Sequence, residues 1–72
     1  MATYHVKHRY GFVGDYNDIW NNIVGDVQDA VIYSRIGAVR TAEAINARVG
    51  ELDRKAVPVM LTSTGKVRQV RW

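Results

Sequence analysis

Apolar and polar residues alternate along the first part of the chain. Within residues 3–12, TYHVKHRYGF, one face collects Tyr4, Val6, Tyr10 and Phe12. A period of two with aromatic and β-branched residues on one side is typical of a strand with one buried face. Glycines follow at positions 11 and 14, where the alternation ends. The pattern predicts an N-terminal strand within residues 1–14.

The spacing of apolar residues then changes to three and four. Residues recurring at these steps are Tyr16, Ile19, Trp20, Ile23, Val24, Val27 and Val31. Such spacing favours an amphipathic helix, and Asp15 is a suitable N-cap. The pattern predicts a helix over residues 15–35 with Trp20 in the core.

A second helical pattern spans residues 41–50. Thr41 is a candidate N-cap, and Ile45 and Val49 lie one turn apart. Gly37 and Gly50 are residues at which helices commonly end. We therefore expect the first helix to end before Gly37 and the second to end at Gly50.

Residues 53–72 are compatible with two structures. In one, Asp53 caps a third helix over residues 53–62, with Pro58 about one turn inside it. In the other, Val57, Val59 and Leu61 alternate as a strand, and a turn at residues 63–66 leads into a second strand. Both alternatives have a strand over residues 66–72.

Length and composition exclude several classes of protein. A chain of 72 residues without cysteine forms one domain, residues 1–72, whose thin core no disulfide reinforces. His5 and His8 are too few to hold a metal, and neither has a catalytic partner nearby in sequence. We therefore expect no enzyme activity, no cofactor and no small-molecule ligand. No apolar run approaches the roughly 20 residues of a membrane span, and no signal peptide is evident, so we expect a cytoplasmic protein.

Charge is unevenly distributed along the chain. The net charge is +3, of which residues 1–35 carry −1 and residues 36–72 carry +4. A positively charged surface of this kind is what binding to phosphates requires. The C-terminal half is therefore the candidate binding region.

The segments after position 18 also resemble a known family. The order Thr41-Ala42-Glu43, Ile45, Val49-Gly50, Asp53-Arg54-Lys55 and Gly65-Lys66-Val67-Arg68 is similar to that of a winged helix-turn-helix DNA-binding domain, over Ile19–Trp72. The resemblance implies a small α+β fold of order β-α-α-α-β with a wing at 66–72. The chain departs from the family at Asn46, where a small Ala is usual, and at Pro58.

The resemblance implies a function and a set of contacts. The protein would bind double-stranded DNA sequence-specifically, as a small transcriptional regulator or recombination accessory factor of phage or prokaryotic type, a class in which homodimers are common. Helix 3 would enter the major groove, and an Arg there adds about 1–3 kcal/mol of discrimination. The implied DNA-binding residues are Arg54 and Lys55 on helix 3, Lys66, Arg68 and Arg71 on the wing, and Arg40, Thr41, Thr62 and Ser63 as further phosphate contacts.

The extended alternative for residues 53–62 implies a different protein. The fold would be β-α-α-β-β, with helices on one face of a three-stranded antiparallel sheet. Such a domain would be a protein–protein interaction or inhibitor module of phage or plasmid type. The conformation of residues 54–61 distinguishes the two hypotheses.

Overall fold

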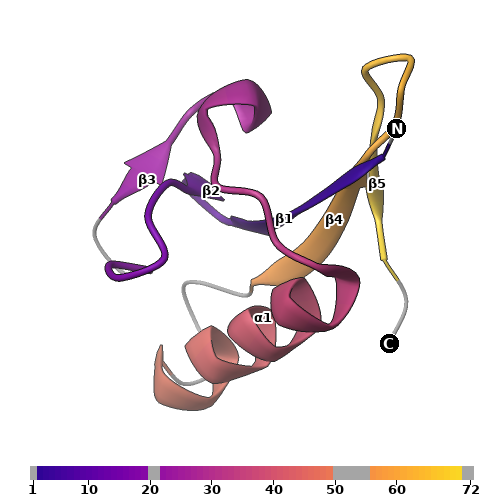
Figure 1. Cartoon of the computed structure of the whole chain (residues 1–72). Coiled ribbons are helices and arrows are strands. Elements are labelled where there is room, and N and C mark those ends of the chain that lie inside the picture. Colours follow the sequence, from indigo (N-terminus) through magenta and orange to yellow (C-terminus); the bar gives the residue numbers. More distant parts are fainter. Residues whose placement is uncertain (1, 20–21, 50–55, 71–72) are drawn as a thin grey trace.

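The chain folds as a five-stranded antiparallel sheet with one α-helix. A computed structural model describes residues 2–19, 22–49 and 56–70. Its elements are β1 (Thr3–His8), β2 (Gly11–Val13), β3 (Ile23–Val24), the 3₁₀ turn η1 (Val27–Asp29), α1 (Arg35–Val49), β4 (Val57–Leu61) and β5 (Val67–Gln69). The strand order is β3-β2-β1-β4-β5, and every neighbouring pair is antiparallel. The helix packs against β1 and β4 (Figure 1).

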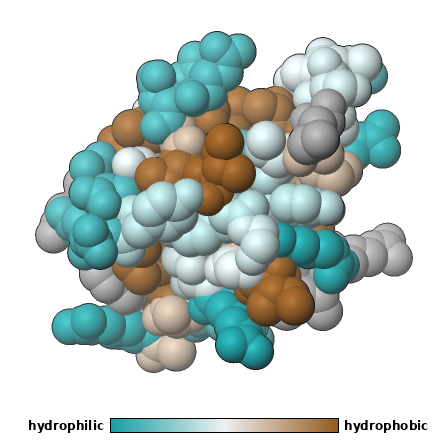
Figure 2. Space-filling view, viewed as in Figure 1, coloured by the Kyte–Doolittle hydropathy of each residue, from teal (hydrophilic) through white to brown (hydrophobic). Residues whose placement is uncertain are grey.

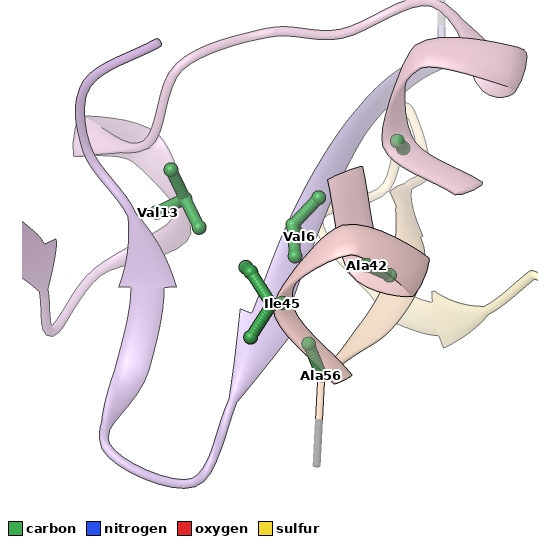
Figure 3. Packing of buried hydrophobic residues seen from close by; sticks show 6 residues of the cluster. Val6, Val13, Ala42, Ile45 and Ala56 are labelled. Atoms are coloured by element: carbon green, nitrogen blue, oxygen red, sulfur yellow. The ribbon is translucent and has the colours of Figure 1, made fainter. Parts of the chain in front are cut away.

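The core lies between α1 and the central strands. Its fully buried members are Val6, Val13, Ala38, Ala42, Ile45 and Ala56. Figure 3 shows Ile45 pointing from the helix toward Val6 and Val13. Alanines at positions 38 and 42 let the helix approach the sheet closely.

Both expected architectures are wrong. The described residues contain one α-helix and five strands, which is neither a winged helix-turn-helix nor a β-α-α-β-β fold on three strands. The decisive region is 57–61, which is extended and pairs with β1 over five residues. Of the two alternatives for this region, the structure has the strand. Residues 51–55, including Asp53, lie outside the described residues.

Pro58 helps to explain this outcome. It lies on β4, where its carbonyl accepts the N–H of Val70 at 2.9 Å. Proline has no N–H to return to the ladder, and registered pairing between β4 and β5 ends at Val59 with Gln69. A proline interior to a helix costs about 3 kcal/mol or more. The β-branched residues on either side of it favour the pleated conformation.

The helix predicted over residues 15–35 is also wrong. That region contains turns, the short strand β3 and η1. Asn17, Asn22 and Gly25 favour turns, while Ile23 and Val24 are β-branched and pair with β2. The expected core position of Trp20 lies outside the described residues.

The second predicted helix begins earlier than expected. It starts at Arg35, so Thr41 lies in its interior. The capping residue is Ser34, whose Oγ accepts the N–H of Gly37 at 3.0 Å. Gly37 therefore lies in the first turn of α1, where an added Cβ would come within 3.0 Å of Ser34 Oγ and 3.6 Å of Tyr33. The expected stop at Gly50 lies outside the described residues.

The predicted N-terminal strand is two strands. β1 ends at His8, and Arg9 and Tyr10 form the turn into β2. Phe12 therefore lies opposite Lys7, on the face away from Val6 and the helix. Tyr10 is exposed in the turn. Tyr4 and Val6 lie on one face of β1, as the alternation predicted. The residues in and after the turn do not continue this pattern.

Candidate functional site: the open edge of β5

The β4–β5 hairpin is a regular structure at one end of the sheet. The N–H of Gly65 donates to the carbonyl of Thr62 at 3.0 Å, and the N–H of Thr62 donates to the carbonyl of Lys66 at 2.8 Å. Gly65 has a φ of +87°, which glycine adopts readily. This is a three-residue hairpin loop with glycine at its left-handed position. In Figure 1 the loop projects beyond the rest of the sheet.

The hydrogen bonds of the hairpin fix which way the β5 main chain points. Lys66 and Val70 use their main-chain groups on β4, through the bonds Thr62 N–H to Lys66 O and Val70 N–H to Pro58 O. Successive residues of a strand direct these groups to opposite sides. The N–H and C=O of Val67 and Gln69 therefore point away from β4. β5 is the last strand of the sheet in the described part of the chain.

The side chains of β5 are also exposed. Val67 is 41% exposed, and Arg68 and Gln69 are exposed as well. Lys66 precedes them at the end of the loop and is exposed. Cationic side chains therefore border an edge that offers main-chain donors and acceptors to a further strand.

The structure gathers part of the expected DNA-binding set on this hairpin. Thr62, Ser63, Lys66 and Arg68 all lie between the end of β4 and the end of β5. Arg40 and Thr41 lie on α1, with Arg40 exposed and Thr41 partly buried. Arg54, Lys55 and Arg71 lie outside the described residues. A recognition helix carrying Arg54 and Lys55 into the major groove has no support, because the segment that would continue it is β4.

The opposite edge of the sheet is β3. Val24 pairs with Phe12, and the N–H of Gly14 donates to the carbonyl of Asn22 at 2.8 Å. By the same alternation, the main-chain groups of Ile23 point away from β2. Asp26 follows β3 directly and caps η1 by accepting the N–H of Gln28 at 3.0 Å. Asp26 and Asp29 are both exposed.

Asn46 anchors the start of β4, a role that the sequence did not reveal. Its side-chain N–H donates to the carbonyl of Ala56 at 2.9 Å, and its Oδ1 accepts the N–H of Ala56 at 2.6 Å. Ala56 is fully buried, so this double contact satisfies a donor and an acceptor that water does not reach. The departure of Asn46 from the winged-helix pattern was the available signal. An amide in place of a small apolar residue indicated a polar partner across the helix face.

The side chains of His5 and Tyr33 contact other parts of the fold. His5 is buried; its Nδ1 donates to the carbonyl of Val31 at 2.9 Å, and its Nε2 lies 2.7 Å from Thr3 Oγ1. The pKa of Tyr33 is raised, chiefly because burial disfavours the phenolate, although Thr41 lies close enough to lower it in part. No partner meets hydrogen-bond geometry at the Tyr33 hydroxyl among the described residues.

Among the described residues there is neither a pocket nor a cluster of metal-ligating side chains. None of the described helices combines the length and apolar character that crossing a membrane would need. In the view of Figure 2, hydrophobic residues gather over the upper part of this face, and pale residues separate them from a smaller hydrophobic group below. The open edge of β5 is the candidate binding surface, because the hydrogen bonds fix its outward main-chain groups and its cations are exposed.

Comparison with protein-family models found no match, and searches of curated proteins and of solved structures found none either.

Proposed function

We propose that this protein is a protein-interaction module that binds an extended segment of another chain along β5. The observation that supports the proposal is the outward direction of the Val67 and Gln69 main-chain groups at the end of the sheet. An extended peptide adds to such an edge through main-chain hydrogen bonds, and side chains at alternate positions supply specificity. The absence of a pocket in the described residues agrees with recognition by an edge.

The charge beside β5 indicates which kind of peptide segment would bind there. Lys66 and Arg68 are exposed beside the edge, and no acidic residue lies within the described stretch 56–70. Opposite charges on paired strands stabilise them by about 0.2–1 kcal/mol per pair, and like charges directly opposite destabilise them. An edge that is short and positively charged discourages indiscriminate pairing. The favoured partner is therefore an acidic segment with β-branched residues between its carboxylates.

A peptide titration followed by NMR tests this function. The probe is a peptide of about ten residues that alternates Glu with Val or Thr, a length that covers a typical strand. We expect the amides of Val67 and Gln69 to shift and to exchange more slowly with solvent. The matched control replaces alternate residues with Pro, which removes the donors while keeping the charge. Equal binding of the control peptide, or shifts that leave β5 unaffected, would refute strand addition.

Duplex DNA is a second candidate partner, favoured by one specific observation. Thr62, Ser63, Lys66 and Arg68 lie on one projecting hairpin, and a two-stranded ribbon fits the major groove. Cations and hydroxyls of this kind bind phosphates. A salt titration of binding to a duplex tests it, because the logarithm of the association constant from phosphate contacts falls linearly with the logarithm of the salt concentration. No binding at low salt would exclude DNA.

A further inference from the structure

The two open edges of the sheet have opposite charge. Residues 10–34 contain Asp15, Asp18, Asp26 and Asp29 and no Lys or Arg, whereas the described stretch 56–70 contains Lys66 and Arg68 and no Asp or Glu. The first stretch supplies β2, β3 and η1, and the second supplies β4 and β5. The strand order places β3 at one end of the sheet and β5 at the other (Figure 1). The molecule therefore has an acidic edge and a basic edge.

We propose that the partner of β5 is the β3 edge of a second copy of this chain, so that copies associate head to tail. This inference rests on the proposed strand addition at β5 and names its partner. Val67 and Gln69 offer main-chain groups at one edge, and Ile23 offers them at the other. Lys66 and Arg68 of one copy then face the acidic end of the next, which carries Asp26 and Asp29.

Symmetric pairing of two β5 strands is less favourable. Two copies of β5 can form main-chain bonds only where outward-pointing residues of one strand face outward-pointing residues of the other. This condition limits the antiparallel registers of a β5–β5 pair. A two-fold axis at Arg68 places Arg68 opposite its own copy, and an axis at Val67 places Lys66 opposite Arg68. An axis at Gln69 places Arg68 opposite Val70. Like charges directly opposite each other destabilise a strand pair. The charges of the edge therefore oppose two of these three β5–β5 registers, and they attract the acidic edge.

Head-to-tail contact leaves a free acidic edge and a free basic edge on every open assembly. Such a heterologous contact produces rings if the rotation closes and open chains if it does not. β3 and β5 are short, with two and three residues, so each contact is small and individually weak. Association is expected to rise with protein concentration and to fall with salt, because the Debye length shortens from about 10 Å at 0.1 M to about 3 Å at 1 M.

Charge reversal at each edge tests the inference by sedimentation velocity. One variant carries Lys66→Glu with Arg68→Glu, so that both edges are acidic. The other carries Asp26→Asn with Asp29→Lys, where the asparagine retains an N-cap oxygen for η1. Wild-type protein should form species larger than a dimer at about 0.1 M salt and dissociate at about 1 M. Each variant alone should associate at least about tenfold more weakly.

Mixing the two variants provides the decisive measurement. The mixture should recover one heterologous contact, between the unaltered β3 edge of the first variant and the unaltered β5 edge of the second. The two altered edges also carry opposite charges, acidic at β5 of the first variant and basic after β3 of the second, so the mixture is expected to form heterodimers and longer alternating assemblies. A control variant with Lys7→Glu and Arg40→Glu changes net charge as much as the first variant, at positions away from both edges. This control should associate more strongly than the edge variants.

Three results would overturn the inference: a wild-type chain that stays monomeric at every concentration, a mixture that does not recover association, or a control as impaired as the edge variants. Circular dichroism of every variant establishes that it is folded. The peptide titration separates the two proposals. If the acidic peptide binds β5 while the chain stays monomeric, strand addition holds and self-recognition is wrong. If neither occurs, both are wrong.

Discussion

The two sides of β1 are held to it in different ways. Toward β5, β4 pairs with β1 over five consecutive residues, and a tight loop joins β4 to β5. Toward β3, β2 pairs with β1 over two residues, and β3 pairs with β2 over two. One side is a regular ladder of main-chain bonds, and the other is a short ladder that needs additional contacts.

Those additional contacts come from the segment between β3 and α1. The N–H of Tyr33 donates to the carbonyl of Tyr4 at 2.8 Å, and the N–H of Val31 donates to the carbonyl of Val13 at 3.2 Å. Tyr16 donates its hydroxyl to the carbonyl of Ile32 and packs edge-on against the ring of Tyr33. The β2–β3 side of the molecule thus depends on main-chain bonds from residues 31 and 33 and on the Tyr16 side chain. The β4–β5 side depends mainly on strand register, with the Asn46 side chain holding the start of β4.

The largest loss of stability is expected from substitution of Ile45, whose side chain packs between the two sides of the sheet. It is 1% exposed and belongs to a cluster with Val13 on one side and Ala56 on the other. Ile45→Ala should lower the free energy of unfolding by about 2–5 kcal/mol, measured by urea denaturation. Ile36→Ala is the control, because Ile36 lies on the same helix and is 63% exposed; a change beyond about 0.5 kcal/mol there would contradict this assignment.

Asn46→Ala should lower the free energy of unfolding by less than Ile45→Ala does. Its first effect should be on the β4–β5 side of the sheet. The substitution leaves the N–H and C=O of the buried Ala56 without the contacts at 2.6 and 2.9 Å. Each unsatisfied buried group costs about 1–3 kcal/mol, so we expect a loss of about 2 kcal/mol or more. Amide exchange should accelerate in β4 before it does so in β2. If Asn46→Ala is as stable as the exposed control Arg40→Ala, the anchor is unimportant.

Gly11→Ala should weaken the β2–β3 side of the sheet and lower the free energy of unfolding by about 1–3 kcal/mol. Gly11 has a φ of +146°, and an added Cβ would lie 2.4 Å from the carbonyl oxygen of Val24. The pairing of β2 with β3 should weaken while the β4–β5 ladder persists. Gly25→Ala is the matched control, because nothing lies within 4 Å of its Cβ position. NMR chemical shifts of β3 and β5 separate the two outcomes.

The smallest change in stability is expected from Tyr33→Phe. Burial raises its pKa, so the fold binds the phenol proton more tightly than the unfolded chain does. The resulting stability is complete below the ordinary tyrosine pKa of about 10 and is lost as pH rises through the folded-state pKa. Tyr33→Phe should weaken this dependence above pH 10 and change stability near neutral pH by about 1 kcal/mol or less. An unchanged alkaline slope in pH-dependent denaturation would show that Tyr33 does not contribute.

Local patterns predicted some elements correctly because their cause was local. The alternation in the sequence of β1 predicted a strand although His5 is buried as well as Val6, and the Ser63–Lys66 turn carries its glycine at the position that needs φ above zero. The helical stripe at Ile45 lies within α1. The region 15–35 misled because its apolar spacing fits a helix, whereas its β-branched residues and its asparagines and glycines fit a strand between turns. Pairing with β2 decided the conflict.

The sequence by itself determined that the chain is small, free of cysteine and basic in its C-terminal half, with acidic residues grouped earlier. It also limited residues 57–61 to a helix or a strand. Only the tertiary structure decided that they form β4 beside β1, and that the acidic and basic stretches end on opposite edges of one sheet. The physical reason is that strand pairing joins residues far apart in the chain. Neither local propensity nor charge along the sequence specifies which strands become neighbours and which remain at an edge.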